Sequence, residues 1–335
     1  MCRTYNGYDM NGFGQMKDGR GNIAPNTIIL PKLAMLAKGE IGNKDIKDFM
    51  KKLDETIFDA RDQLIERYNW ICSQNPKSAT FMYENNTMRG YVKEEGIRSA
   101  LKHGTLAIGQ IGLAETLQIL IGCNQTDPKG LELAKRIEQL FKDRCNEFKH
   151  ELHRDEDGYE YYLNFGVYFT PAENLCYTAM KKFKKEFGEI PNISDKEFFS
   201  NSVHIPVWEK ITAFEKIDIE SQLDSYSSAG CILYVEADGS LRNNLKALET
   251  VVNYAMDKDV PYFAINVPSD QCVDCGYSGK IDLDECCPKC GSKKIKRLRR
   301  VTGYLTGDYL TAFNKGKVEE VENRYVHLDC HEFCN

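Results

Sequence analysis

The sequence predicts an α/β fold that carries a small cysteine-rich module near its C-terminal end. Residues 231–235 and 261–265 are short apolar runs of the kind found in strands, and residues 241–256 between them have a helical pattern. A strand, a helix and a second strand at this spacing are typical of α/β proteins. From Gln271 the composition shifts to Cys, Gly, Lys and Asp, which indicates a separate small module.

The elements of the first half follow from the spacing of apolar residues. Residues 1–25 are rich in Gly, Asn, Asp and Tyr, so we expect an extended or looped segment. Asn43 is expected to cap a long helix, because apolar residues recur at helical spacing as far as Leu64. A second amphipathic helix is predicted over residues 129–151.

Two further stretches of the first half are strongly apolar. Residues 105–123 are interrupted by glycines, so we expect a buried turn that leads into a helix. Residues 161–169 are aromatic and β-branched, which predicts a strand.

The bulk composition excludes several classes of function. The chain has 335 residues, 42% of them hydrophobic, which is enough for one large α/β unit or about two domains. Its formal net charge of −6 argues against a nucleic-acid coat or a polybasic membrane anchor. No apolar run reaches the roughly 20 residues that span a membrane, and the start of the chain does not resemble a signal peptide. Thirteen cysteines without an export signal indicate a reducing cytoplasm.

Four cysteines form the strongest local motif. Cys272, Cys275, Cys287 and Cys290 follow a C-x2-C, eleven-residue gap, C-x2-C pattern, and a glycine directly follows each pair. Four thiolates that converge on one ion describe a closed, structural Zn2+ site. Two reversible disulfides are the alternative, which a reducing cytoplasm disfavours. Cys286 could replace Cys287 as a ligand, but Cys287 keeps the two-residue spacing.

Six basic residues follow this motif between positions 293 and 300. Basic residues beside a zinc ribbon can bind phosphate backbones, so nucleic-acid binding is a rival interpretation. The run is short, the chain is acidic overall, and no aromatic platform for stacking bases accompanies it. We therefore expect no nucleic-acid partner.

Gly303, in the stretch Arg-Arg-Val-Thr-Gly-Tyr-Leu, is suited to one unusual chemistry. A backbone Cα holds a stable unpaired electron when its centre is flat and the spin spreads over the flanking amide groups. A side chain would crowd that geometry, whereas glycine has none and also tolerates the backbone angles of a loop tip. Taken alone, the stretch also fits an ordinary turn.

Several motifs, in order along the chain, resemble those of the anaerobic (class III) ribonucleoside-triphosphate reductases, a family of glycyl radical enzymes. They extend over nearly the whole chain. Besides the cysteine quartet and the glycine stretch they are Cys2-Arg3-Thr4, residues 19–25, 103–106, 112–115, 170–173, 201–207 and 313–317, and Glu319, Glu320, Arg324 and His327.

The resemblance implies a radical relay between two residues. A radical-SAM iron–sulfur activating enzyme removes a hydrogen atom from Gly303, and the glycyl radical then takes a hydrogen atom from the thiol of Cys2. The resulting thiyl radical abstracts the 3′ hydrogen of the ribose, with formate or a dithiol as the final reductant. Asn22 aligns with a position that contacts substrate; an asparagine that caps a loop turn is the equal alternative.

The resemblance also implies a phosphate-binding turn at Thr170, Ala172 and Asn174. The turn directly follows a predicted strand and places Pro171 in the first turn of a helix, where backbone N–H groups can bind phosphate. A capped helix without a ligand explains the same residues equally well.

For the fold, the resemblance implies half of a ten-stranded glycyl-radical-type α/β barrel over residues 1–270. A zinc-ribbon module follows at 271–295, and the glycyl radical loop with the C-terminal tail occupies 296–335. Half a barrel leaves open strand edges. We therefore expect the chain to be inactive without an N-terminal half, supplied by a partner chain or by a longer product, and the complete enzyme to be a homodimer.

Two other functions stay open on the sequence alone: a glycyl radical enzyme of the formate-lyase type, and a non-catalytic zinc-ribbon interaction module.

The remaining histidines and cysteines are expected to have structural roles. His103 and His204 are expected to be hydrogen-bonding rather than catalytic groups. We expect five further cysteines to be small core residues: Cys72, Cys123, Cys145, Cys176 and Cys231. We expect Cys330 and Cys334 to lie in a disordered C-terminal tail.

Overall fold

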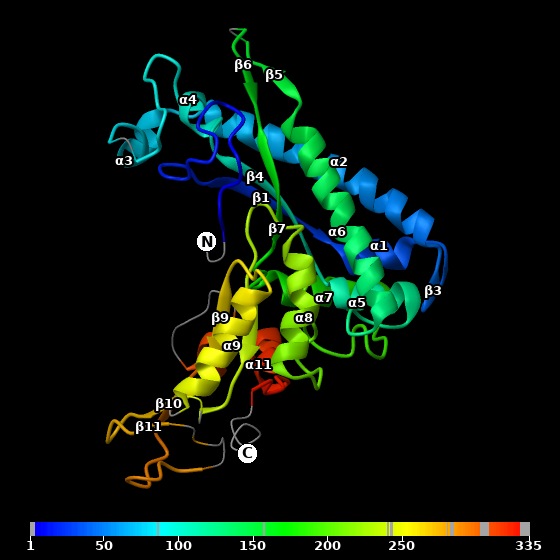
Figure 1. Cartoon of the computed structure of the whole chain (residues 1–335), viewed down its shortest axis with the longest axis vertical. Helices are drawn as coiled ribbons and strands as arrows, with labels where there is room; N and C mark the ends of the chain where they lie inside the picture. Colours follow the sequence, from blue (N-terminus) through cyan, green and yellow to red (C-terminus); the bar gives the residue numbers. More distant parts are fainter. Residues whose placement is uncertain are drawn as a thin grey trace.

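The computed structural model consists of a large α/β body and a smaller C-terminal part (Figure 1). Within the described part of the chain, no helix is both long and apolar enough to cross a membrane. The structure describes residues 4–85, 87–156, 158–239, 241, 244–279, 281, 285–301 and 308–328.

A parallel three-stranded sheet forms the centre of the body. Its strands are β1 (Asn22–Ile29), β4 (Thr105–Ile111) and β7 (Asn164–Phe169), in the order β1-β4-β7. The central strand β4 and its neighbour β7 are buried along their whole length. A Cβ atom at Gly109 of β4 would lie 2.2 Å from the carbonyl oxygen of Tyr168, so only glycine fits there.

Helices cover this sheet and complete the core. α2 (Ile46–Cys72) packs against β1 and α6 (Pro128–Lys149) against β7, and the two helices lie side by side (Figure 1). α1 (Leu30–Leu36) and α5 (Leu113–Ile121) pack against each other. The shorter elements are β2 (Gly39–Glu40), β3 (Asn43–Lys44), η1 (Pro76–Ala79), α3 (Thr80–Tyr83), α4 (Arg98–Leu101), β5 (Leu152–Arg154), β6 (Glu160–Tyr162) and α7 (Leu175–Phe187).

A second parallel pair of strands extends the body. β8 (Leu233–Glu236) pairs with β9 (Phe263–Asn266), and α9 (Leu245–Asp257) connects them, while α8 (Ala213–Asp224) packs against β8. The chain just before β8 runs along β7, to which the N–H of Ala229 donates at 2.8 Å. The described strands form open sheets rather than a closed barrel, so half of a ten-stranded barrel stays a prediction.

The C-terminal part begins with a small antiparallel sheet, which belongs to what we call the cysteine module, residues 269–298. The chain then returns to the body, where Leu328 forms a bridge with Ala237 directly after β8. The elements of this part are β10 (Ser269–Cys272), β11 (Ser278–Gly279), β12 (Ile295–Leu298), α10 (Tyr309–Ala312) and α11 (Lys315–Glu322).

Most predicted elements are present with shifted boundaries. The helices predicted over 129–151 and 241–256 are α6 and α9, and the strands predicted over 231–235 and 261–265 are β8 and β9. The predicted buried stretch 105–123 is the strand β4 followed by α5, rather than a turn and a helix.

Two details of the first half were wrong or missed. Asn43 does not cap α2: it lies in β3, and the N-cap is Asp45, whose carboxylate accepts hydrogen bonds from the N–H groups of Lys47 and Asp48. The strand β1 was not predicted: residues 22–25 were assigned to the extended or looped start of the chain, and residues 26–29 to no element. Pro25 is tolerated in β1 because, among the strands that the structure describes, β1 pairs with β4 alone and is an edge strand.

Candidate functional site

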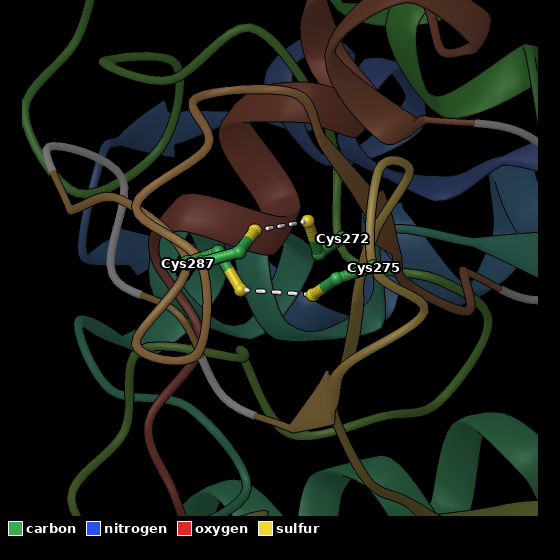
Figure 2. Close-up of side chains that lie close together, drawn as sticks. Cys272, Cys275 and Cys287 are labelled. Carbon is green, nitrogen blue, oxygen red and sulfur yellow. Dashed lines mark hydrogen bonds between the residues drawn. The ribbon is translucent and has the colours of Figure 1, made fainter.

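The four predicted metal ligands converge in the cysteine module (Figure 2). The Sγ atoms of Cys272, Cys275, Cys287 and Cys290 all lie within 4.8 Å of one another. Cys272 and Cys290 are 3.5 Å apart, and Cys275 and Cys287 are 3.6 Å apart. A disulfide needs about 2 Å between its sulfurs, whereas thiolates around one zinc ion are separated by about 3.8 Å. The geometry therefore fits a four-thiolate metal site and does not fit two disulfides.

Two tight turns bring these thiols together. The N–H of Gly276 donates to the carbonyl of Cys272 at 3.0 Å, and that of Gly291 to Cys287 at 2.8 Å. Both glycines have φ of +72°, a conformation that glycine adopts without strain. A backbone N–H of the same turn lowers the pKa of the Cys272 thiol, whereas hydrogen bonds from the neighbouring cysteines raise the pKa of Cys275 and Cys290. Cys286 is exposed and lies outside the group, as predicted.

Cys2 and Gly303, the predicted radical pair, lie outside the described residues. The chain after Cys2 is fixed at Tyr5, whose N–H donates to the carbonyl of Ala229 at 3.1 Å. The Tyr5 hydroxyl donates to the carbonyl of Ser227 at 2.8 Å. The segment that follows Cys2 is therefore attached to the chain just before β8.

Asn22 lies at the start of β1 and contacts the same carbonyl group. Its Nδ2 donates to the oxygen of Ala229 at 3.4 Å. Its Oδ1 is buried and has no hydrogen-bond partner in the described part of the chain. An unpartnered buried acceptor costs about 1–3 kcal/mol, so this oxygen is a candidate to bind a ligand.

A buried polar network around Asp9 holds the loop between Tyr5 and Asn22. Asp9 accepts hydrogen bonds from His103 Nδ1 at 2.8 Å and from Asn164 Nδ2 at 2.7 Å. Burial alone would raise the pKa of Asp9, but these hydrogen bonds lower it below its usual range. The prediction that His103 is a hydrogen-bonding group is confirmed.

The described residues on either side of positions 302–307 lie on one small apolar cluster. Val301 is fully buried and packs with Tyr309 and Phe313. Asp308 accepts a hydrogen bond at 3.2 Å from a backbone N–H of β12, so the far end is also fixed to the cysteine module.

The residue before Val301 contacts β8. The guanidinium group of Arg300 lies 5.3 Å from the ring centre of Tyr234. The chain next to Gly303 therefore contacts Tyr234, and the chain next to Cys2 contacts Ala229. These two contact points are five residues apart in sequence, on the chain that leads into β8.

The predicted phosphate turn follows β7, and its polar groups already have partners within the chain. Thr170 Oγ1 lies 3.1 Å from Thr27 Oγ1. The N–H of Ala172 donates to Oδ1 of Asn201 at 2.7 Å. A phosphate that binds the Ala172 amide would replace Asn201.

Helix α7 begins at Leu175, so the prediction that Pro171 stands in its first turn was wrong. The N–H of Glu173 instead closes a short turn onto the carbonyl of Pro171 at 3.0 Å. The N-cap is Asn174, whose side chain accepts no capping hydrogen bond from α7 and accepts one from Asn314 at 3.0 Å. The start of α7 is thus without a side-chain cap.

A cavity of about 40 Å³ between α8, β8 and α11 is lined by charged side chains that the sequence did not bring together. Glu220 Oε1 lies 2.5 Å from Lys216 Nζ, and Glu220 Oε2 accepts from His204 Nδ1 at 3.1 Å. Burial alone would raise the pKa of Glu220, but Lys216 and His204 lower it to about 2. Burial lowers the pKa of His327 to about 3, and its Nδ1 accepts from the N–H of Glu236 at 3.0 Å.

The buried network continues toward α11. Lys317 Nζ is fully buried and lies 2.6 Å from Glu320, and Asn266 Nδ2 donates to Glu236 at 2.8 Å. Arg324 lies between Glu236 and Glu320, at 3.4 and 3.9 Å. The network contains as many cations as carboxylates, so its charges balance. The cations are the side chains of Lys216, Lys317 and Arg324, and the carboxylates are those of Glu220, Glu236 and Glu320.

The other cysteines divide into two groups. Three of them are buried, as predicted: Cys145, Cys176 and Cys231. The other two, Cys72 and Cys123, are only half-buried. Cys330 and Cys334 lie outside the described residues.

Comparison with known proteins identifies similar sequences over nearly the whole chain. The model of the family described as anaerobic ribonucleoside-triphosphate reductase matches residues 1–327. The anaerobic ribonucleoside-triphosphate reductase of Salmonella typhimurium is 33% identical over 98% of this chain, and that of enterobacteria phage T4 is 30% identical over 97%. The chain spans 45% of the Salmonella protein and 52% of the phage protein, about half of each.

Solved structures show the same fold. One anaerobic ribonucleotide reductase superimposes with a TM-score of 0.70 at 22% identity, over 95% of this chain and 45% of that chain. The anaerobic ribonucleotide reductase from Thermotoga maritima gives a TM-score of 0.68 at 22% identity, over 93% of this chain and 47% of that chain.

Proposed function

The chain belongs to the anaerobic ribonucleoside-triphosphate reductase family, and from this we propose that it carries the radical-storing half of an enzyme that makes deoxyribonucleoside triphosphates for DNA synthesis. The reaction replaces the 2′ hydroxyl of a ribonucleoside triphosphate by hydrogen. It releases water and needs two electrons and two protons. A dithiol would supply all of these as it becomes a disulfide; formate would supply both electrons and one proton as it becomes carbon dioxide, and the second proton would come from water.

Gly303 and Cys2 carry the radical in this proposal. The activating enzyme takes a hydrogen atom from Gly303 and leaves an unpaired electron on its Cα. The thiol of Cys2 gives its hydrogen atom to Gly303, and the thiyl radical takes the 3′ hydrogen of the ribose. After the 2′ hydroxyl has left as water and the reductant has reduced the sugar, Cys2 returns the 3′ hydrogen and recovers its own from Gly303.

One observation carries the proposal: the backbone of Tyr5 contacts Ala229, just before β8, and the side chain of Arg300 contacts Tyr234 within β8. Three peptide units separate Cys2 from Tyr5 and Gly303 from Arg300, and each such stretch spans up to about 10 Å. The two predicted radical residues are therefore each three residues away from a contact with this one stretch of chain.

We assign Zn2+ to the four cysteines as a structural ion. Four thiolates leave no open coordination position, so the ion would take no part in the chemistry. It would hold β10 and β12 together, and β12 leads directly to Arg300 and Val301.

The substrate would contact two places in the body. The unpartnered Oδ1 of Asn22 is available to the sugar. The phosphates would lie against Thr170, Ala172 and Asn174, where the N-terminus of α7 provides backbone donors and a favourable dipole.

The proposed partners are a radical-SAM activating enzyme, the N-terminal half of the reductase and a second copy of the complete enzyme, in a reducing cytoplasm. The test assembles the chain with its N-terminal half, activates it without oxygen and records the electron paramagnetic resonance spectrum. We expect a glycyl doublet that Gly303→Ala removes. Cys2→Ser should keep the doublet and lose deoxynucleotide formation.

An activating enzyme that works on another member of the family in a parallel sample is the control. With that control positive, the absence of a doublet would contradict the proposal. Cys2→Ser with the turnover of the wild type would contradict the assignment of the thiyl radical.

A further inference from the structure

Arg324, directly after α11, binds three separate parts of the chain with one guanidinium group. Its Nη1 donates to the carbonyl of Arg300 at 2.7 Å and lies 3.4 Å from Oε2 of Glu236. Its Nη2 lies 3.9 Å from Oε1 of Glu320. The carbonyl of Arg300 stands just before the segment 302–307, so this hydrogen bond fixes the chain where that segment begins.

We propose that Arg324 is a positioning residue that sets the place of Gly303 through the backbone of Arg300; this inference rests on the proposed function. A charged donor at 2.7 Å makes a strong hydrogen bond to a carbonyl. Hydrogen-atom transfer depends on close approach, and a displacement of about 1 Å at a reacting group can cost about 100-fold in rate.

The surrounding carboxylates hold the guanidinium plane in this orientation. Glu236 is itself fixed by Asn266, whose Nδ2 donates to it at 2.8 Å, and Glu320 is fixed by the buried Lys317 at 2.6 Å. Arg324 is 11% exposed, so little water competes for its donors. A planar group with several fixed donors can bind two carboxylates and a carbonyl at once, which the single ammonium of lysine does less well.

The docking of the C-terminal segment does not depend on Arg324. The N–H of Tyr325 donates to the carbonyl of Val207 at 2.7 Å, and the N–H of His327 donates to the carbonyl of Glu236 at 2.9 Å. These main-chain bonds survive substitution of the side chain, so the variant is expected to fold with α11 in place.

The experiment compares Arg324→Ala and Arg324→Lys with the wild type in the complete, anaerobically activated enzyme. We expect Arg324→Ala to lower kcat at least tenfold while KM for the ribonucleotide stays within twofold, and Arg324→Lys to recover part of the loss. Amide hydrogen exchange should increase in the peptide that contains Arg300 and Val301 and stay unchanged in α11.

Arg144→Ala is the matched control, because Arg144 also binds two carboxylates, those of Asp54 and Glu147, on helices of the body. It should leave kcat unchanged. Arg324→Ala with a kcat within twofold of the wild type, or an equal loss in Arg144→Ala, would overturn the inference. A wild type without a glycyl doublet would overturn the proposed function and this inference together; a wild type with the doublet and a fully active Arg324→Ala would overturn the inference alone.

Discussion

The body and the cysteine module are stabilised by different interactions. The body buries a continuous cluster of apolar side chains that joins the central sheet to α2, α5 and α6. In the described part of the module, the buried apolar side chains are Ile281 and two of the four clustered cysteines, Cys272 and Cys287. Val273 is 65% exposed although it stands between two of the ligands in sequence.

This difference shows what each region depends on. Burial of apolar area stabilises a core by about 25 cal/mol per Å², and in the body this contribution is spread over many side chains. A unit as small as the module buries too little area to fold by packing alone. Bonds from four thiolates to one ion would supply the difference. We therefore expect the body to respond to changes in packing and the module to respond to metal.

Removal of the metal is expected to have the largest effect, confined to the module. Structural zinc contributes on the order of 10 kcal/mol to the folding of small zinc domains. A strong chelator, or Cys272→Ser, should open residues 269–298 to proteases while the cooperative unfolding of the body persists. Limited proteolysis with mass spectrometry, together with the zinc content per chain, measures both.

Cys286→Ser is the matched control for that experiment, because Cys286 is exposed and lies outside the group of four. It should keep its metal and its resistance to proteases. A chelated module that stays resistant, or a body that unfolds at the same chelator concentration, would contradict the comparison.

The second effect concerns a buried carboxyl group in the body. Glu138 of α6 is fully buried and accepts a hydrogen bond from Gln110 of β4 at 2.7 Å. Burial raises the pKa of Glu138 from 4.5 to about 8. The folded state therefore holds this proton more tightly than the unfolded state. The resulting stability is complete below the unfolded pKa and is lost as the pH rises through the folded pKa, by at most about 5 kcal/mol.

Glu138→Gln removes this titration and keeps the shape of the side chain. Urea unfolding of the wild type should lose stability between pH 5 and pH 8.5, and the variant should lose less over the same interval. Glu132→Gln, at an exposed position of the same helix, should follow the wild type. Equal pH dependence of Glu138→Gln and the wild type would show that Glu138 is not neutral in the folded body.

The third effect is a packing change at the centre of the sheet. A Cβ atom at Gly109 would meet Thr170 Oγ1 and the carbonyl oxygen of Tyr168, both at 2.2 Å. Gly109→Ala should lower the free energy of unfolding of the body by about 3 kcal/mol while the module keeps its zinc. Gly21→Ala, where nothing lies within 4 Å of the added carbon, should change it little. Loss of zinc in Gly109→Ala would show that the two regions unfold as one.

The two regions also differ in how far the sequence predicts them. The metal site follows from local spacing, because each pair of ligands stands on one turn closed by glycine. The buried charge network follows from local spacing only in part. Its pairs Lys216–Glu220, Lys317–Glu320 and Glu320–Arg324 are each about one helical turn apart, but local spacing does not join the residues near α11 to β8. Glu236 and Arg324 are 88 residues apart and meet only because the chain returns to β8 after α11.

The ends of elements were the weakest part of the prediction, for a physical reason. A helix begins at the polar residue whose side chain reaches the free N–H groups of the first turn, and the sequence around α2 offers two such residues, Asn43 and Asp45. The choice between them is made by the β2–β3 hairpin, which uses Asn43 for pairing. Pairing of this kind is a contact in space that apolar spacing does not reveal.

The capping difference gives the smallest expected effect and tests that explanation. Asp45 accepts hydrogen bonds from the N–H groups of Lys47 at 2.9 Å and Asp48 at 3.2 Å, and the site is exposed. Asp45→Ala should lower the free energy of unfolding of the body by about 1 kcal/mol in urea titrations. Asn43→Ala should leave it nearly unchanged, because Asn43 caps nothing. If the two variants lost the same stability, the start of α2 would depend on the hairpin as a whole and not on one carboxylate.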